Sequence, residues 1–278
     1  MPKTRILIVV KTYPTLSEKY DELVCTAGFR EDGTWIRIYP IPFRKLDYEK
    51  QYHKWQWIEI DVVKNKSDFR PESYRPTDLD KPFILQERVD CKDNWALRKK
   101  LVLQNVYTDM AKLIQDAKDN KIGTSLAIVK PKEIIDFVCE PCEREWDEER
   151  LSKVNANLAQ SNLFEQQAGV NHLFKIVKKL PYKFSYKFTT DDGIKRRIMI
   201  EDWELGQLYW KCLKDTNDEQ IACQKVKEKY FEWMAKKRDL YFFMGTTLQY
   251  HKSGRNPFII IGAFYPPKSL IESQLSLF

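Results

Sequence analysis

The sequence predicts an α+β fold made of two β-rich lobes, each a small barrel or OB-like sheet, with helices between them. Short strand-like runs cluster in both halves of the 278-residue chain, and segments with helical spacing lie between them. Because 43% of the residues are hydrophobic, the chain can fill one large or two ordinary domains. We expect lobes at residues 1–165 and 166–267, followed by a flexible C-terminal peptide at 268–278.

The first lobe is expected to open with closely spaced strands. The dipeptide Asp32-Gly33 favours a hairpin turn between two of them. Short turns between successive strands are typical of a small barrel. The polar, proline-punctuated residues 64–90 are expected to form a solvated loop. The four runs with strand character are residues 6–10, 23–29, 34–39 and 56–63.

Helices are expected to follow the first strands. Apolar residues recur at helical spacing from Trp95 to Lys118, which predicts one helix capped by Asp93 or Asn94. A second helix is expected at 147–164. Between these helices, residues 125–129 and 133–138 have the character of strands.

The second lobe is expected to begin with a hairpin that has two unlike faces. Aromatic residues occupy alternate positions from Tyr182 to Phe188, so they share one face of a strand, while lysines share the other. Asp191-Asp192-Gly193 makes the turn into a returning strand at 195–200. Two helices, each opened by an aspartate (Asp202 and Asp218), and two strands are expected afterwards, at 202–213, 218–237, 240–245 and 258–264.

Positive charge is concentrated in this hairpin. The formal net charge of the chain is +7, and the window from Lys175 to Arg197 alone contributes +6. Such a patch is typical of polyanion binding, although lysines are also common on the solvent face of an ordinary half-buried sheet. The hairpin residues expected to contact nucleic acid are Lys183, Lys187, Lys195, Arg196 and Arg197.

A second candidate surface lies in the first lobe, where aromatic residues alternate with Arg37 and Arg44. The segments Val24–Gly28 and Asp32–Arg37 resemble the hairpin of small nucleic-acid-binding β-modules, and are similar to the dual OB-type domains of bacterial conflict and phage-defence systems. This resemblance implies a polynucleotide-binding barrel and no defined reaction. The alternative is an aromatic hairpin core with arginines at its rim.

The best catalytic candidates are three carboxylates at a strand-to-helix junction, Glu201, Asp202 and Glu204. Nucleases gather such groups around Mg²⁺, so the ion is expected as a cofactor only if the protein is a nuclease. Helix capping by Asp202, with Glu204 near the positive end of the helix dipole, explains the same residues without catalysis. The chain has no Walker, GxGxxG or GxSxG motif, and no other cofactor is expected.

Neither a metal centre nor a membrane segment is expected. Cys139 and Cys142 form the only CxxC pair, and no second pair stands at zinc-finger spacing. No apolar run approaches the roughly 20 residues that cross a bilayer. The run at 6–10 is also too short for a signal sequence, so we expect a cytoplasmic protein with no membrane partner.

The most specific motif is the final pentapeptide QLSLF, which consists of Gln274, Leu275, Ser276, Leu277 and Phe278. It resembles the short peptide by which bacterial replication and repair proteins dock on the DNA polymerase sliding clamp. The resemblance implies that Leu275 fills one apolar pocket of the clamp and that Leu277 and Phe278 fill a second. It also implies a hydrogen bond from Gln274 at the edge of the cleft, with Ser276 bridging the anchors.

Pro266 and Pro267 support this interpretation of the pentapeptide, because two prolines cannot continue a sheet ladder and the fold is expected to end there. The alternative is that Leu277 and Phe278 fold back onto the protein's own core.

Together these features predict a DNA-associated protein recruited to the sliding clamp, with a role in repair, mobile-element targeting or phage defence. One alternative is a clamp-recruited, metal-dependent nuclease. Another is an RNA-binding β-module whose terminal QLSLF is coincidental.

Overall fold

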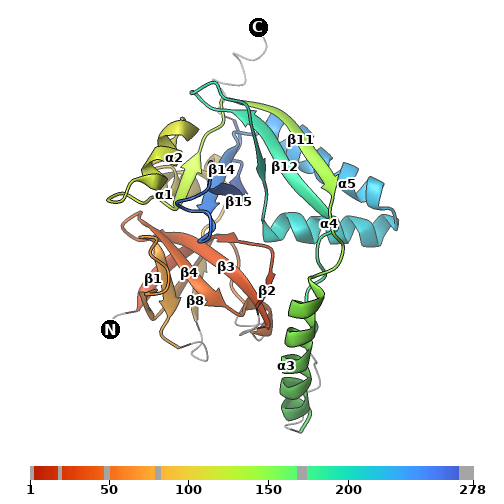
Figure 1. Ribbon diagram of the computed structural model, residues 1–278. Helices are drawn as coiled ribbons and strands as arrows, with labels where there is room; N and C mark the ends of the chain where they lie inside the picture. The colour runs from red at the N-terminus through yellow and green to blue at the C-terminus, as the bar shows by residue number, and fades with distance from the viewer. Residues whose placement is uncertain (1–2, 18–20, 47–50, 79–82, 168–173, 269–278) are drawn as a thin grey trace.

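A computed structural model of the chain, in which residues 3–17, 21–46, 51–78, 83–167 and 174–268 are described, has two β-rich lobes with helices around them (Figure 1). The first lobe is one large curled sheet. The second is built from two smaller sheets and a layer of helices. The expected α+β class is therefore confirmed.

The first sheet has the strand order β6-β7-β4-β3-β1-β5-β8, with β2 paired to β3. Its described neighbours are antiparallel except for β4 and β7, which run parallel. The strands are β1 (Thr4–Lys11), β2 (Thr15–Ser17), β3 (Asp21–Arg30), β4 (Trp35–Ile41), β5 (Gln56–Ile60), β6 (Val62–Lys64), β7 (Ser73–Pro76) and β8 (Ile84–Arg88).

Strand β1 is apolar on both faces, and the structure gives each face a partner. Ile6 and Ile8 pack inside the curled sheet. Leu7 and Val9 point the other way and pack against Phe264 and other residues of the second lobe. Because β1 is buried on both faces, successive residues are all apolar instead of alternating with polar ones. This explains the continuous apolar run at 6–10.

The second lobe contains two sheets, with orders β15-β14-β10-β9 and β11-β12-β13. A parallel bridge between Ile200 and Ile260 joins them. Their described strand pairs are antiparallel except for β9 and β10. The strands are β9 (Val106–Tyr107), β10 (Leu126–Val129), β11 (Glu133–Pro141), β12 (Tyr182–Thr189), β13 (Arg196–Met199), β14 (Tyr241–Thr246) and β15 (Phe258–Phe264).

Helices α4 and α5 cover the sheets of the second lobe, burying Tyr209 and Val226 in one cluster with Phe184. As expected, the side chains of Asp202 and Asp218 cap them by accepting backbone hydrogen bonds. In Figure 1, α3 projects beyond the sheets. The helices are α1 (Lys92–Val102), α2 (Met110–Lys118), α3 (Glu148–Gln167), α4 (Trp203–Thr216) and α5 (Glu219–Lys227), which continues as a π-helix over Glu228–Ala235. Within the described ranges, no helix is long and apolar enough to span a bilayer.

The single helix expected from Trp95 to Lys118 is wrong. The chain leaves α1 after Val102, forms the short strand β9, and begins again as α2 with Asp109 as its cap. Val106 sits on the helical stripe of the sequence, but it pairs with Ile128 in a parallel ladder. Strand pairing with a distant segment therefore overrides the local helical pattern.

The solvated loop expected at 64–90 is also wrong in part. Strands β7 and β8 lie within it, and Asp68 and Arg70 are buried. The expected lobe boundary near residue 165 does not coincide with a change of sheet, because β9 and β10 already share a sheet with β14 and β15. The sheets change between β8 and β9.

Gly28 allows β1 and β3 to approach closely, and we predict that Gly28→Ala destabilises the first lobe. A Cβ at this position would overlap the carbonyl oxygen of Leu7 and lie 2.8 Å from its carbonyl carbon. Because backbone atoms cannot rotate away, we expect a loss of about 2 to 3 kcal/mol in the free energy of unfolding, measured by urea denaturation. Gly193→Asn is the control, since Gly193 has φ +72° in open space, which asparagine tolerates. Equal stability of the two variants would contradict this account.

Candidate nucleic-acid interface and inter-lobe pocket

A cavity of about 380 Å³ lies between the two lobes. The first lobe contributes residues from β3, β4 and the segment between β6 and β7. The second lobe contributes the residue before Asp202, the end of β14 and the start of β15. The lining includes Arg37, Asp68 and Arg70 from the first lobe and Glu201, Thr246 and Thr247 from the second. The cavity exists because both lobes place short polar segments at this junction.

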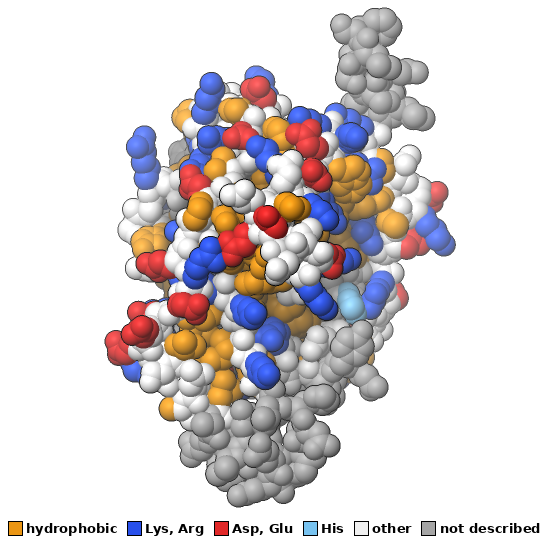
Figure 2. Space-filling model, turned by 90° about the vertical axis from the view of Figure 1, so that its right-hand side faces the viewer, with side chains coloured by type: hydrophobic (Ala, Val, Ile, Leu, Met, Phe, Trp, Pro, Cys, Tyr) orange, Lys and Arg blue, Asp and Glu red, His pale blue; other side chains and the backbone are white. Residues whose placement is uncertain are grey.

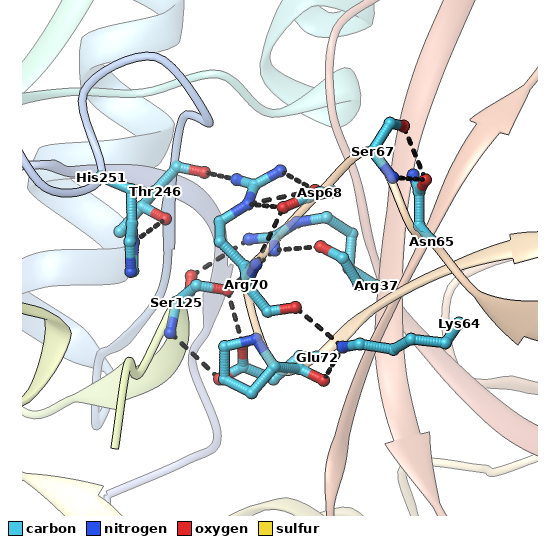
Figure 3. Close-up of polar contacts among 12 residues, drawn as sticks. Arg37, Lys64, Asn65, Ser67, Asp68, Arg70, Glu72, Ser125, Thr246 and His251 are labelled. Atoms are coloured by element: carbon cyan, nitrogen blue, oxygen red, sulfur yellow. Dashed lines mark hydrogen bonds and ion pairs between the residues drawn. The ribbon is translucent and has the colours of Figure 1, made fainter. Parts of the chain in front are cut away.

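Arg37 extends from β4 to the second lobe (Figure 3). Its guanidinium donates to the Ser125 Oγ at 2.8 Å, to the Ser125 carbonyl at 3.1 Å and to the Ser73 Oγ at 3.1 Å. Glu72 holds Ser125 in turn, accepting from its amide at 3.0 Å and from its hydroxyl at 2.6 Å. Arg37 is only 2% exposed, and this burial lowers its pKa.

Arg70 makes a second connection between the lobes (Figure 3). Its Nε donates to the Asp68 Oδ1 at 2.9 Å, and a terminal nitrogen donates to the Oδ2 at 2.6 Å. The other terminal nitrogen donates to the carbonyl oxygen of Thr246 on β14. Burial acts to raise the pKa of Asp68, but hydrogen bonds from Arg70 and Ser73 outweigh it and lower the pKa to about 2. The Asp68 carboxylate therefore stays ionised at neutral pH.

Two polar groups of the cavity have no such partner. The carboxylate of Glu201 forms no hydrogen bond or ion pair with any residue that the structure describes, and burial raises its pKa. The hydroxyl of Thr247 is buried and also lacks a hydrogen-bond partner in the described part of the chain. An unsatisfied buried hydroxyl such as that of Thr247 is uncommon in native proteins, and Glu201 is partly exposed. Both groups are therefore available to a bound molecule.

The other two carboxylates of the predicted catalytic trio point elsewhere. Asp202 accepts from Lys54 at 2.9 Å while capping α4, and Glu204 lies 3.2 Å from the same ammonium. Burial acts to lower the pKa of Lys54, but these carboxylates outweigh it and raise the pKa. The arrangement is a buried ion pair at a helix start. Across the described ranges, no three Asp, Glu, His or Cys side chains converge in a way that could hold a metal ion.

The hairpin of β12 and β13 has the two faces expected from the sequence. Phe184, Tyr186 and Phe188 are buried, whereas Lys183 and Lys187 are exposed.

Carboxylates compensate part of the hairpin's positive charge. Arg196 pairs with Asp192 at 2.6 Å, and Arg197 donates to the Glu140 of β11 at 2.6 Å. Lys187 lies 3.9 Å from Asp136, also on β11. Lys183 and Lys195 are exposed and form no ion pair with described residues. Figure 2 likewise shows basic and acidic side chains interspersed over one face of the molecule. The hairpin's field is therefore weaker than its sequence charge indicates.

The remaining predicted residues have varied positions. Arg37 is buried in the inter-lobe junction, away from any rim. Arg44 pairs with Glu22 at 2.6 Å and its guanidinium lies over the Phe174 ring. The clamp-binding peptide, residues 274–278, lies outside the described residues. Sequence reasoning missed Thr247. It allowed a contact between Asp68 and Arg70 but placed both in a solvated loop, so their burial and the contact of Arg70 with Thr246 were not expected.

Comparisons with known proteins give two family matches. The model described as "Domain of unknown function (DUF8757)" matches residues 106–278, and the model described as "Domain of unknown function (DUF8758)" matches residues 2–104. A search of the curated proteins gave no match.

Two solved structures are similar to the chain. One is the crystal structure of the tetrameric p202 HIN2, with a TM-score of 0.31 at 7% identity, covering 96% of this chain and 92% of that one. The other is a murine DNA binding protein bound with ds DNA, with a TM-score of 0.32 at 10% identity, covering 97% of both chains. At such low TM-scores neither likeness carries an argument about this protein.

We predict that His251 makes the junction sensitive to acid. Its Nδ1 lies 2.9 Å from the Thr246 Oγ1, it is 1% exposed, and burial lowers its pKa to about 4. This value of about 4 also includes the nearby cations of Lys252, Arg70 and Arg37, which lower the pKa, and Glu72, which raises it. Because the folded-state pKa is depressed, this stability is complete above the unfolded pKa near 6.5 and is lost as the pH falls toward 4.

Urea denaturation at several pH values tests this account. The unfolding free energy should fall by about 2 to 3 kcal/mol more between pH 7 and pH 4.5 in the parent protein than in His251→Gln. His53→Gln is the comparison variant: His53 is exposed, but burial also lowers its pKa, so this variant measures how much of the acid sensitivity comes from His53. Parallel profiles for the parent and His251→Gln would refute the assignment.

Proposed function

We propose that this chain, which belongs to the DUF8757 family of unknown function, is a DNA-associated protein recruited to the bacterial sliding clamp by Gln274 to Phe278. The observation that carries the proposal is the pentapeptide itself, in which all five positions agree with the clamp-binding pattern. Its apolar anchors alternate with polar residues, as expected for a peptide that binds a preformed groove.

The described fold extends through both prolines. The bridge between Arg238 and Pro267 closes the second lobe, and the amide of Asp239 donates to the Pro266 carbonyl at 3.0 Å. The last described residue is Lys268, and the pentapeptide begins at Gln274. These contacts at Pro266 and Pro267 are the last described pairing, and a proline cannot donate a further ladder hydrogen bond.

The proposed contact with DNA is electrostatic and independent of sequence. Lys183 and Lys195 are its main cations, since neither forms an ion pair with a described carboxylate, although Lys183 lies opposite Glu140 in the β11–β12 ladder. Lys187, Arg196 and Arg197 add to the contact where their carboxylates are displaced. A tether to the clamp raises the local concentration of the protein at DNA, so weak phosphate binding suffices. The proposed setting is DNA repair, mobile-element targeting or phage defence in the cytoplasm.

Clamp binding is predicted to depend on the apolar anchors. In calorimetric titrations of purified bacterial sliding clamp, the full chain should bind saturably, and the double variant Leu277→Ala/Phe278→Ala should bind at least about tenfold more weakly, because two anchors that fill pockets are lost. Ser269→Ala, outside the motif, is the control and should bind like the parent. Equal affinity of parent and double variant, or no heat from either, would remove the basis of the proposal.

The hairpin is predicted to contribute to phosphate binding. The double variant Lys183→Gln/Lys195→Gln should bind a DNA duplex more weakly and reduce the slope of log K against log salt by about 1 to 2, as expected for two lost phosphate contacts. Fluorescence anisotropy over a salt series measures this slope. Lys214→Gln/Lys225→Gln, which removes two exposed helical lysines, is the matched control.

An unchanged slope in the hairpin variant would place the contact elsewhere. Tighter binding of an RNA duplex than of DNA, without clamp binding, would favour the RNA-binding alternative.

A further inference from the structure

The inter-lobe cavity has the properties of a small-molecule pocket. Its volume of about 380 Å³ falls within the range of roughly 300 to 1,000 Å³ that such pockets occupy, and it lies at an interface between two lobes, where they are often found. Leu248, Ile259 and Ile261 give it apolar walls. These walls suit a ligand with apolar faces and a polar edge.

The polar groups of the cavity specify that edge. The Glu201 carboxylate accepts hydrogen bonds and has no partner among the described residues, and the buried Thr247 hydroxyl has none either. Leaving the buried Thr247 hydroxyl unsatisfied costs roughly 1 to 3 kcal/mol, which a ligand that pairs with it would recover, and the Glu201 carboxylate can accept from the same ligand. A matching ligand therefore carries at least one N–H donor beside another hydrogen-bonding atom.

The charges of the cavity disfavour a small anion. Arg70 is committed to Asp68 and to the Thr246 carbonyl, and Arg37 is committed largely to Ser125. With these arginines engaged, Glu201 is the charged group without a described partner, and it would repel a phosphate or carboxylate. The group inside the cavity is therefore not an anion, and an uncharged group with an N–H donor satisfies Glu201.

A wider, basic hollow adjoins the cavity and shares Tyr39, Asn65 and Ser67 with it. Lys66 and Arg75 also line this hollow. Both are exposed and form no ion pair with any residue in the described ranges. Tyr39 is 38% exposed, so its ring offers an aromatic surface at the entrance. An anion attached to a ligand in the cavity would meet these two cations.

We propose that the inter-lobe cavity binds a single unstacked nucleobase, with Glu201 and Thr247 on its hydrogen-bonding edge and with Lys66 and Arg75 on the adjoining phosphate. A nucleobase combines flat apolar faces with neutral donors and acceptors, as the cavity requires. The base comes either from a nucleic-acid strand or from a free nucleotide. The inference uses no residue of the hairpin or the terminal peptide, so it stands or falls independently of clamp recruitment.

Calorimetry with the full chain tests the pocket first. The four common nucleoside 5′-monophosphates and their nucleosides are the free probes. The strand probes are a short DNA duplex with one unpaired base and the same duplex with an abasic residue there. Binding of a monophosphate would identify a free nucleotide as a ligand, and at least about tenfold tighter binding of the unpaired-base duplex than of the abasic one would identify a strand. No saturable binding of any free probe, together with equal affinity for the two duplexes, would overturn the proposal.

Two conservative variants then test the edge contacts. Glu201→Gln should weaken binding of the probe that binds by about tenfold or more, as expected for a hydrogen bond to a charged group. Thr247→Val should weaken it by a smaller factor, while leaving the free protein at least as stable in thermal unfolding, because the valine removes an unsatisfied hydroxyl. Glu133→Gln, at an exposed position on β11, is the control. Unchanged affinity in both pocket variants would refute the assigned edge.

The phosphate contact has its own test. Lys66→Gln/Arg75→Gln should weaken binding of the monophosphate or the strand but not of the corresponding nucleoside. An equal change for nucleoside and monophosphate would refute the placement of the phosphate at these two residues.

Discussion

The two lobes are held in position by buried arginines of the first lobe that also contact the second. Arg37 of β4 reaches Ser125, and Arg70, between β6 and β7, reaches the carbonyl of Thr246 while it pairs with Asp68. Burying a guanidinium without partners is costly, so each arginine stabilises the junction only while the lobes keep this arrangement. The cavity lies between these contacts, and its shape depends on them.

A second buried ion pair, with an apolar contact beside it, fixes the opposite side of the junction. Lys54 of the first lobe meets Asp202 at the start of α4, and both side chains are almost fully buried. Leu7 and Val9 of β1 pack in one cluster with Phe264 of β15. The three carboxylates that the sequence offered as catalytic candidates therefore have different surroundings. Two of them hold the lobes together, and only Glu201 faces the cavity.

The distribution of charge shows how tertiary neighbours change the meaning of a sequence. The hairpin window has a charge of +6 when counted along the chain. In three dimensions Glu140 and Asp136 of β11 lie beside it, and the turn's own Asp192 pairs with Arg196. Lys66 and Arg75, by contrast, stand in a segment of unremarkable charge but share one hollow beside the cavity. Local charge density is therefore a poor guide to the field that a ligand meets.

The sequence by itself determined the α+β class, most strands and the two faces of the hairpin, because period-two alternation and turn residues act over a few neighbouring positions. It also supplied the terminal pentapeptide, whose pattern is local by nature. Tertiary structure alone decided that Val106 pairs as a strand and that the segment around Arg70 is buried. The partner of Arg70, Thr246, is 176 positions away, and no local pattern specifies a contact at that separation. The inter-lobe cavity could not be predicted from the sequence either, because the residues that line it come from both halves of the chain.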